Sequence, residues 1–162
     1  MVDDLLGGWT NRYADELKHR RTSVVYRPAV WAEPWITAWL WTSEPQTPAK
    51  VREELLTCIH RTAYIQLHGA ARSLGALLEQ EGQAMAMAGV AEPKLDNDDI
   101  AYTRIVLEPF LAENGEPTLI AALFGDGAAR ELGYTPLGLS ARAGLALALA
   151  DATSSRRNAT RI

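Results

Sequence analysis

Apolar residues recur at spacings of three and four along residues 48–81, the longest helical pattern in the chain. Thr47 can cap this helix, and Pro48 suits its first turn. A helix of this length extends roughly 50 Å and normally buries its apolar face in a hairpin or an oligomer. The pattern therefore predicts a long central helix and a homo-oligomer. The stripe contains Val51, Leu55, Ile59, Ala63, Leu67, Ala70, Leu74, Leu77 and Leu78.

Shorter helical patterns flank this segment, and extended patterns are scarce because β-branched residues are few. The only good extended stretch is TSVVYRP, at 22–28. Pro109 should kink its helix or end it at Glu108, and residues 82–94 read as a weak helix or a linker. The sequence thus predicts a mostly α fold, with flanking helices at about 10–21, 34–41, 96–111, 118–124, 128–132 and 136–152.

Breaks rich in proline and glycine divide the chain into three predicted segments. Residues 1–47 form an N-terminal helix and a Trp-rich arm, 48–125 form the long-helix core, and 126–162 form a helix-turn-helix-like segment and a basic tail. Hydrophobic content of 48% and charged content of 22% are typical of a globular protein. We expect no signal peptide and no membrane contact, because the sequence has no apolar run of membrane-spanning length. Cys58 is the only cysteine, which favours a reducing, cytoplasmic location.

The charge is unevenly distributed, although the net charge is only −4. Residues 79–116 contain nine acidic side chains against Lys94 and Arg104. From Arg130 onward, five arginines oppose Glu131 and Asp151. Since the middle is acidic and the tail basic, any contact with nucleic acid should be local to the C-terminal segment.

Residues 127–143, GAARELGYTPLGLSARA, have the residue types of a helix-turn-helix. Ala129 is small where two helices would cross, Gly133 suits the turn, and Leu139 would pack back on the first helix. A plain helix corner explains the same residues, with Gly133 as a helix C-cap and Thr135 as the N-cap of the next helix. Both interpretations stay open on the sequence.

The stretch AARELGYTPLGLSARAGL, at 128–145, resembles a segment near the C-terminus of one class of phage terminase small subunits. The sequence differs from the family's pattern at one point: the arginine follows Thr-Pro closely in that family, whereas here Arg142 lies six residues beyond Pro136. The resemblance implies a non-enzymatic, helical DNA-packaging subunit that assembles into rings, contacts double-stranded DNA and recruits a protein partner. The alternative is a structural or adaptor oligomer with no nucleic acid partner. The predicted DNA contacts are Thr135, Ser140, Arg142, Arg156 and Arg157, with Lys18, Arg20 and Arg21 as further candidates.

Tryptophans are concentrated between residues 31 and 41. Pro34 suits the first turn of a short helix in which Trp35 and Trp39 share one face. Stacking on bases would call for interleaved basic residues, and there are none between Trp31 and Trp41. We therefore predict that Trp31, Trp35 and Trp39 lie in the core or in a subunit interface.

The sequence shows no catalytic constellation, and we expect neither an enzyme nor a cofactor. Cys58, His60 and His68 lie in the long helical pattern, but the two histidines are eight residues apart, too far for a helical metal pair. These three residues are the whole basis for a competing hypothesis of a helical enzyme with a metal or small-molecule site. The acidic DNDD stretch at 96–99 lacks the glycine and glutamate of a calcium loop and suits helix capping.

Overall fold

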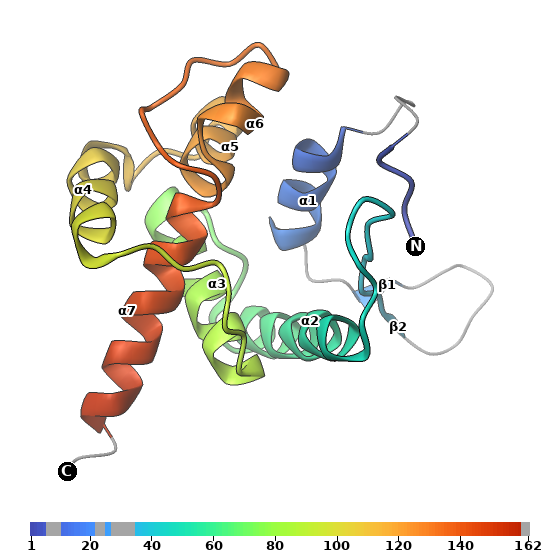
Figure 1. Ribbon diagram of the computed structural model, residues 1–162. Helices are drawn as coiled ribbons and strands as arrows, with labels where there is room; N and C mark the ends of the chain where they lie inside the picture. Colours follow the sequence, from blue (N-terminus) through green and yellow to red (C-terminus); the bar gives the residue numbers. More distant parts are fainter. Residues whose placement is uncertain (6–10, 22–24, 27–34, 160–162) are drawn as a thin grey trace.

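The structure is a computed structural model that describes residues 1–5, 11–21, 25–26 and 35–159. It confirms the mostly α fold (Figure 1). The elements are α1 (Arg12–Arg21), β1 (Val25–Tyr26), β2 (Trp35–Ile36), α2 (Pro48–His68), α3 (Leu74–Ala88), α4 (Asn97–Leu107), the 3-10 turn η1 (Glu108–Phe110), α5 (Glu116–Phe124), α6 (Asp126–Glu131) and α7 (Ala143–Ala159).

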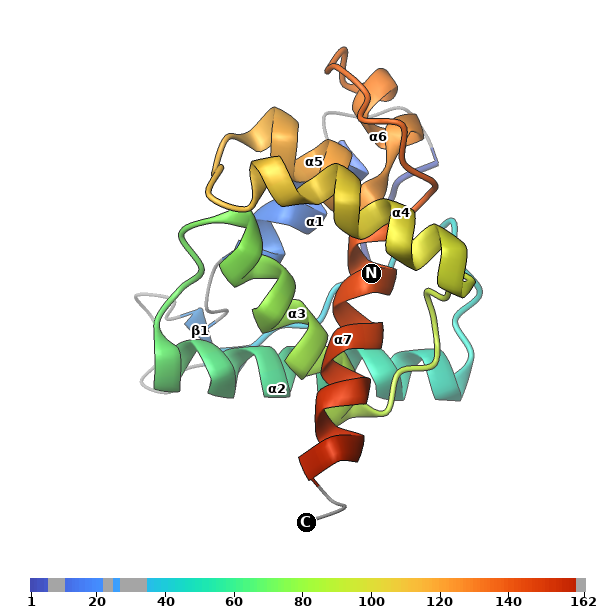
Figure 2. The ribbon, with the colours of Figure 1, turned by 90° about the vertical axis from the view of Figure 1, so that its left-hand side faces the viewer.

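Helix α7 is central to the packing. It lies beside α3, while α2 crosses behind the two helices and α4 and α5 cross above them (Figure 2). One apolar cluster draws residues from α1, α3, α4, α5 and α7, so the N-terminal helix, the middle of the chain and its C-terminal helix share a core. The large apolar side chains that are almost completely buried are Leu74, Leu77, Leu107, Leu119, Ile120, Leu123 and Leu145.

Helix starts follow the predicted caps. The Thr47 hydroxyl accepts a hydrogen bond from the Lys50 backbone N–H at 3.2 Å, at the start of α2. The Asp96 carboxylate accepts one from the Asp99 N–H at 2.8 Å, at the start of α4. Helix α4 ends at Leu107, before Pro109, as the sequence predicts.

The predicted unbroken helix over 48–81 is wrong, because α2 ends at His68 and α3 begins at Leu74. Gly69 has a φ of +83° and closes α2, with its N–H donating to the Ile65 carbonyl at 2.8 Å. Ser73 then caps α3 through a hydrogen bond from the Ala76 N–H. The two helices fold back on each other, so the apolar stripe is divided between elements that run in different directions.

The predicted helix in the Trp-rich stretch is also wrong. Trp35 and Ile36 form β2, which pairs antiparallel with β1 so that Val25 lies opposite Ile36. The extended prediction for 22–28 is confirmed at Val25–Tyr26. Residues 37–40 are not helical, and the Trp39 ring stacks on His19 of α1 at a centroid distance of 5.1 Å. Strand pairing and this aromatic contact replace the local helical preference.

The second helix of the predicted helix-turn-helix starts at Ala143 rather than at Pro136. Residues 132–142 form an irregular loop, much longer than the three- or four-residue turn of that motif. The Asp126 carboxylate holds the loop by accepting the N–H groups of three successive residues, 137–139, at 2.9–3.0 Å. Gly133 does end α6, as the residue after the C-cap Leu132: its φ is +71° and its N–H donates to the Arg130 carbonyl at 3.1 Å. The plain helix corner is therefore right about Gly133 and wrong about Thr135.

Candidate binding groove between helices α3, α4 and α7

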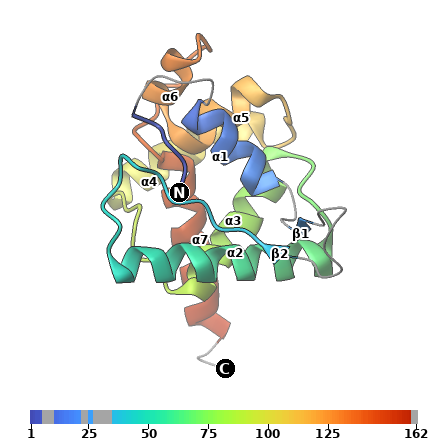
Figure 3. The same ribbon diagram turned by 90° about the vertical axis from the view of Figure 1, so that its right-hand side faces the viewer.

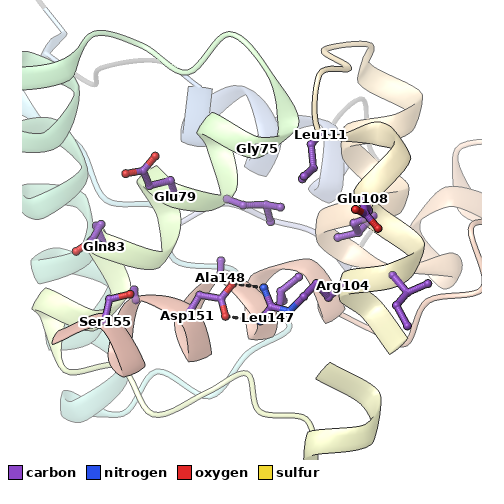
Figure 4. Close-up of a pocket in the computed structure, with 14 residues that line it drawn as sticks. Gly75, Glu79, Gln83, Arg104, Glu108, Leu111, Leu147, Ala148, Asp151 and Ser155 are labelled. Atoms are coloured by element: carbon purple, nitrogen blue, oxygen red, sulfur yellow. Dashed lines mark hydrogen bonds and ion pairs between the residues drawn. The ribbon is translucent and has the colours of Figure 1, made fainter. Parts of the chain in front are cut away.

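Three helices enclose a groove with a volume of about 590 Å³ (Figure 4). Helix α3 forms one wall, α4 and η1 form the other, and α7 lies along the floor. This volume is within the range of sites that bind small molecules or peptide side chains. The apolar lining residues are Leu78, Ile105, Leu107, Leu111, Leu147, Ala148 and Ala152.

Glycine at two positions of α3 sets the shape of the groove. A Cβ on Gly82 would lie 2.3 Å from the Ala148 carbonyl oxygen, so α3 and α7 approach each other as closely as their backbones allow. At the other end of the groove, the Gly75 N–H donates to the Leu111 carbonyl at 2.9 Å, which joins α3 to the chain after η1. The α3 wall is therefore attached to the floor at one end and to the opposite wall at the other.

An ion pair connects the α4 wall to the floor. The Arg104 guanidinium makes two hydrogen bonds with the Asp151 carboxylate of α7, at 2.6 and 2.9 Å. These hydrogen bonds raise the pKa of Arg104. Because the two charges neutralise each other, Glu79 and Glu108 leave the rim with an excess of negative charge. Ile105 is 68% exposed beside them.

The lining of the groove combines apolar and acidic side chains. It contains three carboxylates but no histidine, cysteine or lysine. Within the described ranges, no group of three or more His, Cys, Asp or Glu side chains could hold a metal ion. Its chemistry is an apolar floor with a negatively charged rim.

A buried network of charges joins α1 to the rest of the molecule. The Glu16 carboxylate pairs with Arg20 at 2.6 Å and with Arg142 at 2.9 Å. The Glu81 carboxylate accepts two hydrogen bonds from Arg61, at 2.7 and 2.9 Å, and also pairs with Arg20. Burial by itself raises the pKa of Glu81, but the positive charges of Arg61 and Arg20 outweigh it and lower the pKa to about 2. Both carboxylates are therefore ionised at neutral pH.

Cys58 lies in the same region, with its Sγ 3.6 Å from His19 Nε2. Burial, together with the charges of Arg61 and Arg20, lowers the pKa of His19 to about 4. Burial also raises the pKa of the Cys58 thiol. Both groups are thus neutral at pH 7, and the thiol is not activated as a nucleophile. The competing hypothesis joined Cys58 to His60 and His68, but those histidines line a depression on the outer surface of α2 and α3.

The predicted DNA-binding residues do not come together. Thr135 and Ser140 are exposed on the loop before α7, whereas Arg156 and Arg157 are exposed near the far end of α7 (Figure 1). Arg142 is engaged by Glu16 through two hydrogen bonds, at 2.9 and 3.1 Å. Of the further candidates on α1, Arg20 is buried in the charge network, Lys18 is exposed and Arg21 is half-buried.

The two described tryptophans of the predicted interface, Trp35 and Trp39, lie in different surroundings. Trp35 is 51% exposed on β2, whereas Trp39 is half-buried between His19 and Trp41. Trp31 lies outside the described residues. Trp35 and Trp39 therefore do not share a helix face.

The sequence did not predict the groove as a site. Its one usable signal was the excess of acidic residues between 79 and 116, which includes both Glu79 and Glu108. The pairing of Arg104 with Asp151 joins residues 47 positions apart and leaves no local pattern.

Part of the chain is similar to a bacterial protein. The chain is 30% identical over 112 residues to the uncharacterized protein YjfC of Bacillus subtilis. The aligned region covers 64% of this chain and 37% of YjfC. The chain thus spans little more than a third of the length of that relative. No protein-family profile matches the sequence, and no solved structure matches it. Among the described helices, none is long and apolar enough to cross a membrane.

Proposed function

We propose that this protein is a non-enzymatic helical adaptor whose α3–α4–α7 groove binds a basic amphipathic helix of a partner protein. The observation that carries the proposal is the apolar groove of about 590 Å³ with acidic residues on its rim. A helix in a groove buries apolar side chains spaced three and four apart and keeps its polar face in water. The leucines and alanines of the floor match those apolar side chains.

Charge supports a basic partner. Of the nine acidic residues between 79 and 116, all except Glu81 are exposed. The two basic residues of this stretch are Lys94 and Arg104, and Arg104 is already paired with Asp151. This surface therefore attracts lysine and arginine side chains and disfavours the phosphates of nucleic acid.

Binding of a designed peptide tests the proposal. The probe is a fluorescent amphipathic helix of leucine and lysine, compared with a leucine–glutamate helix and with a scrambled leucine–lysine peptide. We expect fluorescence anisotropy to show saturable binding of the leucine–lysine helix only. Ile105→Ser removes exposed apolar surface from the groove and should weaken binding about tenfold. The matched control is Leu67→Ser, which removes an exposed apolar side chain from α2 and should leave binding unchanged.

Two results would contradict the adaptor proposal. One is equal binding of the acidic and basic helices, because the rim charges then do not distinguish the two peptides. The other is an equal effect of Ile105→Ser and Leu67→Ser, because the contact then lies outside the groove.

A contact with double-stranded DNA, implied by the resemblance to terminase small subunits, stays a prediction. It is favoured by two exposed arginines in the last turn of α7, Arg156 and Arg157. Replacing both by alanine should weaken duplex binding and reduce the slope of log K against log salt by up to about 2. The control, Arg52→Ala with Arg72→Ala, removes the same charge from other exposed positions. If salt titration shows unchanged binding in the Arg156 and Arg157 variant, these two arginines of α7 do not contact DNA.

A further inference from the structure

Helix α2 has its apolar face toward solvent and its polar face toward the core. The residues that it buries are Thr57, Cys58, Arg61, Thr62 and Ile65, of which only Cys58 and Ile65 are apolar. Leu55, Ile59 and Leu67 are instead 48%, 46% and 80% exposed. A helix of a globular protein normally has the opposite orientation, so the exposed side needs a partner.

The exposed apolar residues form one regular row. Leu55, Ile59, Ala63 and Leu67 are each four positions apart, which places them along a single ridge of the helix, whereas Val51, one step earlier, is half-buried. Within the described ranges no helix covers this side of α2, which lies in front of α3 and α7 in Figure 3. The ridge is flanked by a depression of about 360 Å³ between α2 and α3, to which Ala63 and Leu67 also contribute.

We propose that this ridge is the interface of a homodimer, in which α2 of a second copy packs antiparallel on it about a two-fold axis at Ile59. Such an interface requires that residues equally far before and after Ile59 fit each other, because the two-fold axis brings each of them against the other in the second copy. Leu55 then meets the partner's Ala63. This pair joins a larger side chain to a smaller one, so the two ridges interdigitate and the leucine enters the depression beside Ala63.

Charge distribution fits the same arrangement. Arg52 is exposed near the N-terminal end of the ridge. Glu79 is exposed and lines the depression near the C-terminal end of α2. An antiparallel partner brings Arg52 of each copy toward Glu79 of the other copy. A parallel partner would place like charges together, which disfavours it.

Light scattering at increasing protein concentration tests the dimer. We expect the mass of two chains at tens of micromolar. Ile59→Glu places two carboxylates at the axis and should give the mass of one chain, with an unchanged circular dichroism spectrum because Ile59 is exposed. Ile105→Glu makes the same replacement on α4 and should stay dimeric. A wild-type monomer at several hundred micromolar, or a dimer that survives Ile59→Glu, overturns the proposal.

Cross-linking tests the register without disrupting the interface. In a Cys58→Ala background, Ile59→Cys places two thiols at the axis, and diamide should oxidise them to a disulfide between chains. Gln66→Cys, exposed on the same helix but away from the axis, should cross-link much less. Equal cross-linking at both positions overturns the proposed register. Peptide binding in the groove is measured on another face, so failure of the dimer and failure of the adaptor function are distinguishable.

Discussion

Replacing Glu81 by alanine is expected to lower the free energy of unfolding by about 3–5 kcal/mol, the largest effect of any single carboxylate in this protein. Glu81 is fully buried and neutralises both Arg61 and Arg20. Without it, the buried Arg61 keeps its charge and loses its carboxylate partner, and Arg20 keeps only its pairing with Glu16. Urea denaturation followed by circular dichroism at pH 7 measures the change.

Acid should reduce the difference in unfolding free energy between the wild type and Glu81→Ala. The pKa of Glu81 is about 2 in the folded protein and about 4.5 when unfolded, so its stabilising contribution is complete above pH 4.5 and is lost as the pH falls toward 2. The control is Glu79→Ala, which removes an exposed carboxylate from the same helix and should change stability by less than about 0.5 kcal/mol. If the two variants were equally stable, the buried network would not hold the fold together.

Replacing Gly82 by alanine is expected to destabilise the protein by about 3 kcal/mol, although alanine normally favours a helix over glycine by about 1 kcal/mol. The new methyl group would lie 2.3 Å from the Ala148 carbonyl oxygen and 3.3 Å from the Ala152 Cβ. Helices α3 and α7 would have to separate, which would also widen the groove.

The control for this prediction has the opposite sign. Gly127, in α6, has no heavy atom within 4 Å of the position of an added Cβ. Gly127→Ala should therefore stabilise the protein by about 0.5–1 kcal/mol. Chemical denaturation of both variants gives the comparison. Stabilisation by both substitutions would mean that α3 and α7 do not cross as closely as described.

Helix starts were the part of the fold that local sequence could predict. Thr47 and Asp96 cap their helices as expected, because a cap needs only a side chain and a backbone N–H three residues away. The break between α2 and α3 was missed, since residues 70–72 are two alanines and an arginine, all good helix formers. The signals for the break were present in Gly69 and Ser73, but the apolar periodicity on both sides concealed them.

Periodicity also could not say which side of α2 faces the core. It identified the row containing Leu55, Ile59 and Leu67 correctly, yet that row faces outward. The buried side includes Arg61, whose partner comes from another element. Arg61 pairs with Glu81, twenty residues away, and Arg142 pairs with Glu16, 126 residues away. Such pairs depend on the tertiary fold, so a single sequence does not show them.

The central position of α7 governs how the chain can fold as it is synthesised. This helix contributes Leu145, Leu147 and Leu149 to the core, yet it is translated after every other described element. Until it leaves the ribosome, the core side chains of α3 and α5 have no α7 to cover them. A nascent chain therefore exposes apolar surface until α7 has been synthesised, and it makes a suitable substrate for chaperones that hold unfinished chains.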